Sequence, residues 1–339
     1  MAKKSLFSRV AVLAVVLFGA LGIAGVSILK GSCVSEPVEL YIHAGTPYSA
    51  LLDTLEAHGV KKLQLIDLFG KYEQLESNIK PGHYVLGKGA NAIGIVRLIK
   101  SGAQKPVKLV INNTRTLDQL AAKLALQLEA DSAAFYRHLT NPATAEKYGL
   151  KQEELIGMFI PNTYEVWWTA SPESITERMS REWKAFWNEK RTAKLERIGL
   201  SKMKVITLAS IVYEETKNVS EMSKIAGVFV NRLRRGIPLQ ACPTAKYAVG
   251  DFGLKRILNK HIQFESPYNT YINRGLPPGP ICVPSIAAID AVLNYTEHNY
   301  IYFCAKEDFS GTHNFAATLA EHNANANRYQ AALNKRGIK

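Results

Sequence analysis

The first strong pattern along the chain is an uninterrupted apolar run from Val10 to Leu29, with basic residues before it and Lys30 after it. Twenty residues at a helical rise of about 1.5 Å span roughly the 30 Å hydrocarbon core of a bilayer. Because basic flanks stay in the cytoplasm, we expect a cytoplasmic tail at 1–9, a transmembrane helix at 10–30 and export of the rest. The alternatives are a cleaved signal peptide, a lipoprotein or a buried core helix.

Beyond this run, the spacing of apolar residues predicts a small α+β module at 38–104. Alternation of apolar and polar residues indicates strands, and apolar residues three and four apart indicate helices. Glycine and proline mark the turns between these elements. The expected elements are strands at 38–42 and 83–86 and helices at 48–58, 63–72 and 93–99.

The pattern of strand, threonine-bearing turn and helix then restarts, with a strand at 107–111 and a helix at 117–128. Residues 130–200 read as mainly helical, interrupted at 157–164 by a segment containing Gly, Pro and Asn. The expected fold class is therefore α+β. A mixed α/β domain at 105–339 follows the small module.

The helix predicted at 205–216 carries the most informative carboxylate. It has no charge until its last turn, where Glu215 falls on an apolar stripe and Glu214 on a polar stripe that should face water. An apolar setting raises the pKa of a carboxyl group, as a general acid at neutral pH requires. The alternative is a helix-end Glu that caps the helix or pairs with Arg232 or Arg235.

Four later segments read as rigid loops, several fixed by proline, that carry amides, hydroxyls and aromatic rings. Such side chains suit the lining of a sugar-binding cleft, although each segment alone is equally consistent with a structural turn. The four segments are 239–244, 266–271, 275–281 and 311–315.

Composition changes the picture in one respect, because 42 Lys and Arg against 29 Asp and Glu give a net charge of +13. Such a balance favours an anionic partner. Four positive side chains lie in the first thirty residues, where they orient the transmembrane helix. The exported part has a net charge of +9. Export makes a nucleic-acid partner improbable, and an anionic envelope polymer or the outer membrane face remains.

The four cysteines, together with the rest of the sequence, offer no zinc-ligand spacing, and no nucleotide-binding loop is present, so no metal and no cofactor are expected. Outside the cytoplasm a disulfide is chemically permitted. A Cys242–Cys282 bridge is one reading, and small buried thiols are the other.

Taken in order, the motifs of the second domain resemble the YceG-like family of MltG-type endolytic murein transglycosylases. The match includes A-S-I-V-Y-E-E-T at 209–216, L-Q-A-C-P-T at 239–244 and G-L-P-P-G-P at 275–280. The segments V-F-V-N-R-L at 228–233, Y-N-T-Y at 268–271 and H-N-F at 313–315 continue it. Two departures are Tyr213, where the family has a first Glu, and Cys242, where relatives commonly carry Asp.

The resemblance implies non-hydrolytic cleavage of MurNAc-β-1,4-GlcNAc bonds in peptidoglycan, leaving 1,6-anhydro ends, with Glu215 as the catalytic acid and base. It also implies a LysM-like glycan-binding module at 38–104, although a spacer is possible, and association with peptidoglycan polymerases at the periplasmic side of the inner membrane. The expected substrate-lining residues are Gln240, Thr244, Tyr247, Asn269, Tyr271 and His313.

Two other functions stay open at this point. Cys242 and the residual charge of +9 are consistent with a non-catalytic envelope protein that binds glycan or recruits cell-wall synthases. A glycoside hydrolase would leave reducing ends. Glu214 points about 100° away from Glu215 on the same helix, which disfavours a facing pair of carboxylates.

Overall fold

A computed structural model describes residues 31–254 and 256–337. By internal contacts the chain forms two compact units, the first reaching Lys108 and the second containing most of the remainder. The predicted transmembrane helix at 10–30 lies outside the described residues. Among the residues that are described, none of the helices combines the length and apolar character needed to cross a bilayer.

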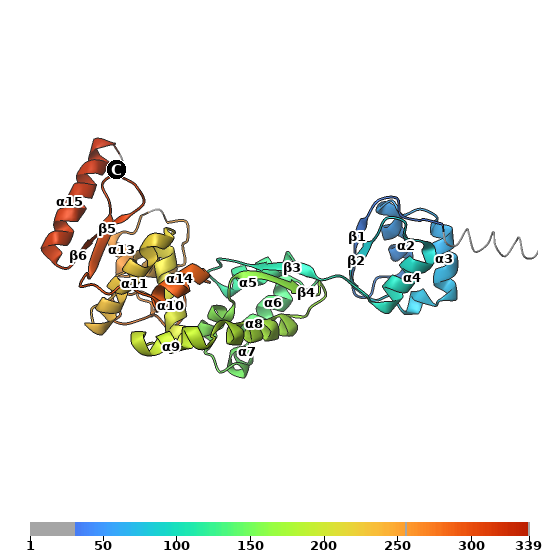
Figure 1. Cartoon of the computed structure of the whole chain (residues 1–339), viewed down its shortest axis with the longest axis horizontal. Helices are drawn as coiled ribbons and strands as arrows, with labels where there is room; N and C mark the ends of the chain where they lie inside the picture. Colours follow the sequence, from blue (N-terminus) through green and yellow to red (C-terminus); the bar gives the residue numbers. More distant parts are fainter. Residues whose placement is uncertain (1–30, 255, 338–339) are drawn as a thin grey trace, which may run out of the picture. The chain divides into compact units, whose positions relative to one another are not determined.

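The first unit is a two-stranded antiparallel sheet with helices packed against it (Figure 1). Val38 pairs with Leu86 and Ile42 with Gly82. The alternation that predicted the first strand places Leu40 and Ile42 in the core. The structure confirms the predicted order of strands and helices. The elements are β1 (Val38–Ile42), α2 (Tyr48–Ala57), α3 (Leu63–Tyr72), η1 (Leu75–Ser77), β2 (Gly82–Leu86) and α4 (Ala92–Ser101).

Two short segments from further along the chain also belong to the first unit, Gln127–Glu129 and Glu165–Ala170. The Glu129 carboxylate accepts a hydrogen bond from the Ala44 amide at 2.6 Å, and the Trp168 ring packs edge-on against Tyr41. The sequence pattern assigned both segments to the second domain. Periodicity cannot detect this exchange, because it depends on tertiary contacts alone.

The chain that follows α4 is mainly helical, with two small two-stranded sheets, and most of it belongs to the second unit. Strand β3 pairs with β4 and β5 with β6, and α15 packs along β5 and β6 (Figure 1). The elements are β3 (Val107–Ile111), α5 (Leu117–Ala125), α6 (Ser132–Thr140), α7 (Pro142–Lys147), η2 (Gln152–Met158), β4 (Asn162–Val166), α8 (Pro172–Phe186), α9 (Glu189–Ile198), α10 (Lys202–Glu215), α11 (Val219–Arg234), α12 (Cys242–Val249), α13 (Asn259–Ile262), α14 (Ile286–Leu293), β5 (Tyr302–Ala305), β6 (His313–Ala316) and α15 (Leu319–Lys335).

Helix α10 is the centre of this unit and packs against α11, α12 and α14. All but one of the residues from Met203 to Val212 are buried, including Thr207 and Ser210 on the stripe that was expected to face water. Thr216 then adopts an extended backbone (φ −145°), which ends the helix at Glu215. The last turn of α10 therefore carries two carboxylates out of the hydrophobic core.

Two of the segments expected to be loops are partly regular. Helix α12 begins at Cys242, with Pro243 in its first turn, where the missing N–H of proline costs nothing. His313 lies on β6, which pairs with β5 so that Cys304 faces Asn314 and Ala305 faces His313. Helix α11 begins at Val219, where Asn218 caps it by accepting from the Ser220 amide.

Candidate active site

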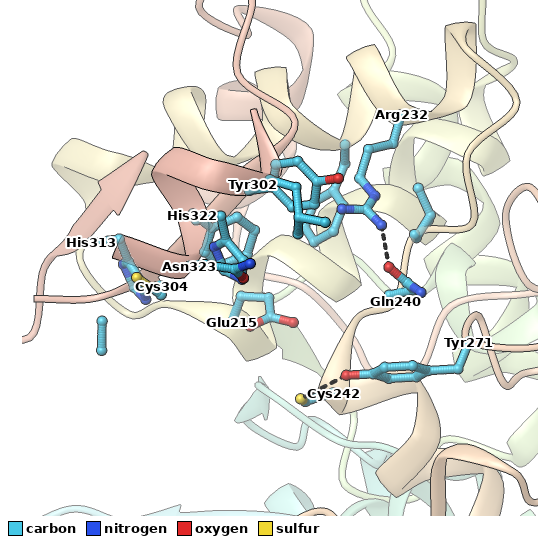
Figure 2. Close-up of a pocket in the computed structure, with 15 residues that line it drawn as sticks. Glu215, Arg232, Gln240, Cys242, Tyr271, Tyr302, Cys304, His313, His322 and Asn323 are labelled. Atoms are coloured by element: carbon cyan, nitrogen blue, oxygen red, sulfur yellow. Dashed lines mark hydrogen bonds between the residues drawn. The ribbon is translucent and has the colours of Figure 1, made fainter. Parts of the chain in front are cut away.

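The Glu215 side chain opens into a cavity of about 550 Å³ in the second unit (Figure 2). Aromatic rings, amides and imidazoles form most of the wall, a combination suited to sugar hydroxyls and ring faces. Among the described residues that line the cavity, Glu215 is the only carboxylic acid. The others are Phe229, Arg232, Leu239, Gln240, Cys242, Tyr271, Tyr302, Phe303, Cys304, Ala305, His313, Leu319, His322 and Asn323.

Burial raises the pKa of Glu215 to about 7, and the negative charge of neighbouring Glu214 contributes to the increase. Within the described part of the chain, no ion pair or hydrogen bond holds the Glu215 carboxyl group. Arg232, one partner considered from the sequence, instead donates to the carbonyl oxygens of Pro238 and Ile301 and to the Gln240 side chain. Glu215 therefore has the environment of a proton donor that acts near neutral pH.

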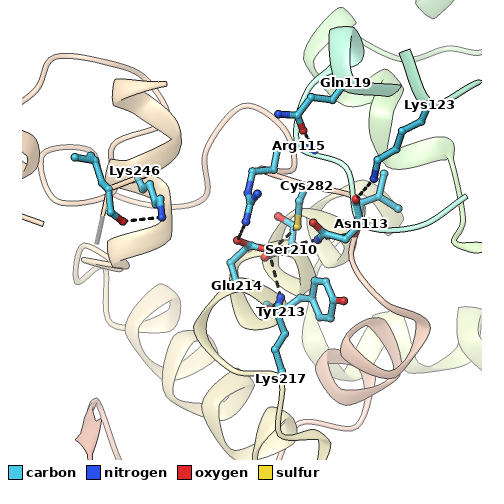
Figure 3. A network of polar contacts seen from close by, with 12 residues as sticks. Asn113, Arg115, Gln119, Lys123, Ser210, Tyr213, Glu214, Lys217, Lys246 and Cys282 are labelled. Atoms are coloured by element: carbon cyan, nitrogen blue, oxygen red, sulfur yellow. Dashed lines mark hydrogen bonds and ion pairs between the residues drawn. The ribbon is translucent and has the colours of Figure 1, made fainter. Parts of the chain in front are cut away.

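Glu214 does not face water, which corrects the expectation from the helical stripe. Only 13% of its side chain is exposed, and it accepts from Arg115 at 2.7 Å and from Asn113 at 3.3 Å (Figure 3). Although burial acts in the opposite direction, the bond from Arg115 and the charge of Lys217 keep the pKa of Glu214 lowered. The two neighbouring carboxyl groups therefore have pKa values shifted in opposite directions.

The ion pair between Arg115 and Glu214 should stabilise the second unit measurably. In a double-mutant cycle with Arg115→Met and Glu214→Gln, we expect a coupling free energy of about 1–2 kcal/mol in urea unfolding, because Glu214 is largely shielded from water. The exposed pair Arg328–Glu307 is the matched control, for which a coupling close to zero is expected. Equal coupling in the two cycles would contradict this assignment.

Three of the predicted substrate-lining residues surround the cavity together with Glu215: Gln240, Tyr271 and His313. The Gln240 side-chain oxygen accepts a hydrogen bond from the Arg232 guanidinium, and the Gln240 backbone N–H donates to the Thr270 carbonyl. The Tyr271 hydroxyl lies 3.2 Å from the Cys242 sulfur.

His313 is fixed by Glu221, which accepts from both its backbone amide and its Nδ1. The imidazole is thus oriented by a carboxylate from the first turn of α11. The sequence was equally consistent with His313 as a turn residue whose hydrogen bonds are satisfied within the protein. The structure places His313 on a strand, in the cavity wall, and with this partner.

The other three predicted residues do not line this cavity. Thr244 and Asn269 are fully buried, and Thr244 shares a 2.7 Å hydrogen bond with Thr270. Tyr247 packs on Tyr268 and lines a separate, smaller pocket together with Glu214. Thr244 and Asn269 therefore support the loops that carry Gln240 and Tyr271 instead of meeting a substrate directly.

Most of the wall was not singled out from the sequence as substrate-lining, including Arg232, Tyr302, His322 and Asn323. Three of these four come from β5 and α15, near the C-terminus. Of these four residues, only Arg232 lies in a segment that had been noted from the sequence, the V-F-V-N-R-L motif at 228–233. The cavity is assembled from elements separated by more than a hundred residues, so local spacing could not locate it.

All four cysteines in the described residues are free thiols, so Cys242 and Cys282 are not bridged. The Cys282 sulfur is buried and donates to the Ser210 carbonyl at 3.7 Å, which fits the reading of a small buried side chain. In the part of the chain that the structure describes, no three His, Cys, Asp or Glu side chains gather as metal ligands would.

An α+β fold with one protonatable carboxyl group in an aromatic and amide-lined cavity is typical of enzymes that cleave polysaccharides through a single general acid. Comparison with known proteins identifies the family. The chain belongs to the YceG-like family, whose model matches residues 40–328.

Its relatives include proteins of known name and structure. It is 30% identical to the endolytic murein transglycosylase of Bacillus subtilis, with 93% of each chain covered. It is 29% identical to the endolytic murein transglycosylase of Streptococcus pneumoniae, over 78% of this chain and 54% of that protein. The crystal structure of a YceG-like protein from Listeria monocytogenes matches with a TM-score of 0.57 and 30% identity, covering 85% of this chain and 98% of that one.

Proposed function

We propose that this protein is an endolytic murein transglycosylase, a lyase that cleaves MurNAc-β-1,4-GlcNAc bonds within peptidoglycan strands and leaves 1,6-anhydro-MurNAc ends. The observation that carries the proposal is the unpaired Glu215 carboxyl group, with a pKa of about 7, in a cavity suited to sugars. The names of the relatives from Bacillus subtilis and Streptococcus pneumoniae support the same substrate.

Glu215 performs both proton transfers of this reaction. Its protonated carboxyl group donates to the glycosidic oxygen, the C1–O bond breaks, and the leaving GlcNAc hydroxyl is released. The resulting carboxylate then removes the proton from the C6 hydroxyl of MurNAc, whose oxygen bonds to C1. Glu215 donates one proton and takes one back, so the reaction consumes no water and needs no second carboxylate.

A hydrolase is the main competing enzyme, and it would need either a second carboxylate or an activated water. No second acid lines the cavity among the described residues, and Glu214 is bound to Arg115 on another side of the helix. Mass spectrometry of products from purified glycan strands separates the two reactions. Anhydro ends are expected, whereas reducing ends formed with uptake of water would refute the proposal.

A non-catalytic glycan-binding protein is the other candidate, motivated by Cys242 beside the acid. The pKa of the Cys242 thiol is raised, mainly by burial, so it remains neutral and does not provide a charge in place of Asp. Retention on sacculi without any turnover, over the pH range and after reduction, would favour this function over catalysis.

The raised pKa of Glu215 predicts a specific dependence on pH. The acid form is present below about pH 7 and is lost above it, so kcat/KM should fall about tenfold per unit well above that value. We would measure initial rates of anhydro-end formation on uncrosslinked strands from about pH 5 to about pH 9. A rate that rises continuously toward alkaline pH would exclude Glu215 as the acid.

The location and the role of the first unit complete the proposal. The apolar run at 10–30 and its basic flanks support a single-pass inner-membrane anchor with residues 1–9 in the cytoplasm and residues 31–339 in the periplasm. The order β1-α2-α3-β2 supports a LysM-like module that binds glycan. Family membership is the basis for expecting peptidoglycan polymerases as partners and the ending of nascent strands as the outcome.

A further inference from the structure

Arg232 is a buried cation that has no anionic partner among the described residues. The residue is 6% exposed, and its guanidinium donates three hydrogen bonds, all to neutral oxygens of Pro238, Ile301 and Gln240. No carboxylate of the described residues lies within ion-pair distance. Buried charges are normally paired, because desolvating an isolated ion is costly. Arg232 lines the cavity, and a guanidinium has five N–H donors, so two remain for a bound anion.

His322 lines the same cavity and also has a polar atom without a partner among the described residues. Its Nδ1 is buried, and no hydrogen-bond partner lies within the residues that the structure places. The imidazole stacks on Tyr302 with 5.0 Å between ring centroids, and the Arg232 guanidinium lies 5.6 Å from the same ring. Burial and the charge of Arg232 lower the pKa of His322, so the ring is neutral and retains one N–H donor.

The two groups reach the cavity from elements other than the one that carries the acid. Arg232 comes from the last turn of α11 and His322 from α15, whereas Glu215 ends α10 (Figure 2). The cavity thus combines a neutral proton donor with a separate positively charged part of its wall. A substrate that fills both must carry a negative group next to the sugar bond that is cleaved.

We propose that Arg232 and His322 form a subsite for a carboxylate of the glycan strand, which selects the sugar whose C1 is placed at Glu215. This inference rests on the proposed function. Of the two alternating sugars of murein, only the muramyl residue bears a carboxyl group, as a free lactyl group or through its stem peptide. Binding that group in the cavity would place the MurNAc-GlcNAc bond, and not the GlcNAc-MurNAc bond, at the acid.

Binding to the full-length Glu215→Gln chain tests the subsite without turnover. The three probes are glycan strands stripped of peptides, the same strands with lactyl carboxylates converted to methylamides, and peptide-bearing strands. If the lactyl group is the ligand, methylamide formation weakens binding about tenfold or more, the scale of a charge-assisted hydrogen bond. If only peptide-bearing strands bind tightly, the stem carboxylate occupies the subsite. Equal affinity for all three probes overturns the proposal.

Two variants test the residues themselves in the same background. Arg232→Lys changes the guanidinium fork, and His322→Phe keeps a ring on Tyr302 but removes the nitrogen. Both should weaken the binding of carboxylate-bearing strands by a larger factor than the binding of methylamide strands. Arg235→Lys, at the exposed end of α11, is the matched control and should retain the full preference.

Equal losses for charged and neutral strands in both variants would indicate a structural role and refute the subsite. His322 lies on a helix without buried residues, so His322→Phe remains informative even if Arg232→Lys does not fold. The product assay is independent of this result. A wild-type chain that forms no anhydro ends would refute the proposed function, whether or not binding depends on carboxylates.

Discussion

Replacing Glu215 by Gln is expected to abolish the release of anhydro-ended fragments from purified glycan strands. The amide occupies nearly the same volume but can neither donate the proton to the glycosidic oxygen nor accept one from the C6 hydroxyl. Loss of one general acid–base group typically costs about 10²–10⁴ in rate. Because the same group serves both steps here, we expect a loss at the upper end, measured as anhydro-MurNAc ends per unit time.

The matched control is Glu196→Gln on the exposed face of α9, which should retain full activity. Folding of the Glu215→Gln variant can be verified by its stability. Because the folded-state pKa of Glu215 is raised, ionisation costs the wild type stability as pH rises through about 7. The Gln variant should therefore be about 1–3 kcal/mol more stable than wild type at alkaline pH, with little difference at acid pH. A variant that folds and still forms anhydro ends would overturn the catalytic assignment.

The sequence predicted the helix that carries Glu215 well, because its signal is local. An uncharged run that ends in two carboxylates, with Glu215 in line with the apolar positions, is sufficient to identify a buried acid. The same periodicity misplaced Glu214. The polar residues that share its stripe, Thr207 and Ser210, are buried and bond to their own helix backbone, at Met203 and Thr207.

The rest of the site depends on contacts that no local pattern records. Arg232 and His322 line the same cavity because α11 packs against β5 and β5 packs against α15. The residues of β5 are all half-buried, so the strand lacks the alternation that identifies strands elsewhere in the chain. Thr244 and Asn269 carry polar side chains in segments rich in turn residues. Nothing in their sequence distinguishes a buried amide that holds a loop from an exposed amide that binds sugar.

Asn269 is therefore the residue for which we expect the largest effect on stability. Its Nδ2 donates to the carbonyls of Ile262 and Phe264 at 3.1 and 2.8 Å, and its Oδ1 accepts from the Tyr271 amide at 3.1 Å. Asn269→Ala would remove these three hydrogen bonds from partly buried backbone groups. Each unsatisfied group costs about 1–3 kcal/mol, so we expect a total loss of about 2–4 kcal/mol in the free energy of unfolding.

The exposed neighbour Asn273 provides the control for this substitution. It donates to the carbonyls of Ser266 and Asn269 in the same loop, but water can replace its amide, so Asn273→Ala should cost about 1 kcal/mol or less.

Because Asn269 also fixes the backbone of Tyr271 in the cavity wall, Asn269→Ala should raise KM for glycan strands even at temperatures where it remains folded. Urea unfolding and steady-state kinetics of the two variants measure both effects. Equal stability of the two variants would contradict the assignment of Asn269 to the support of the loop.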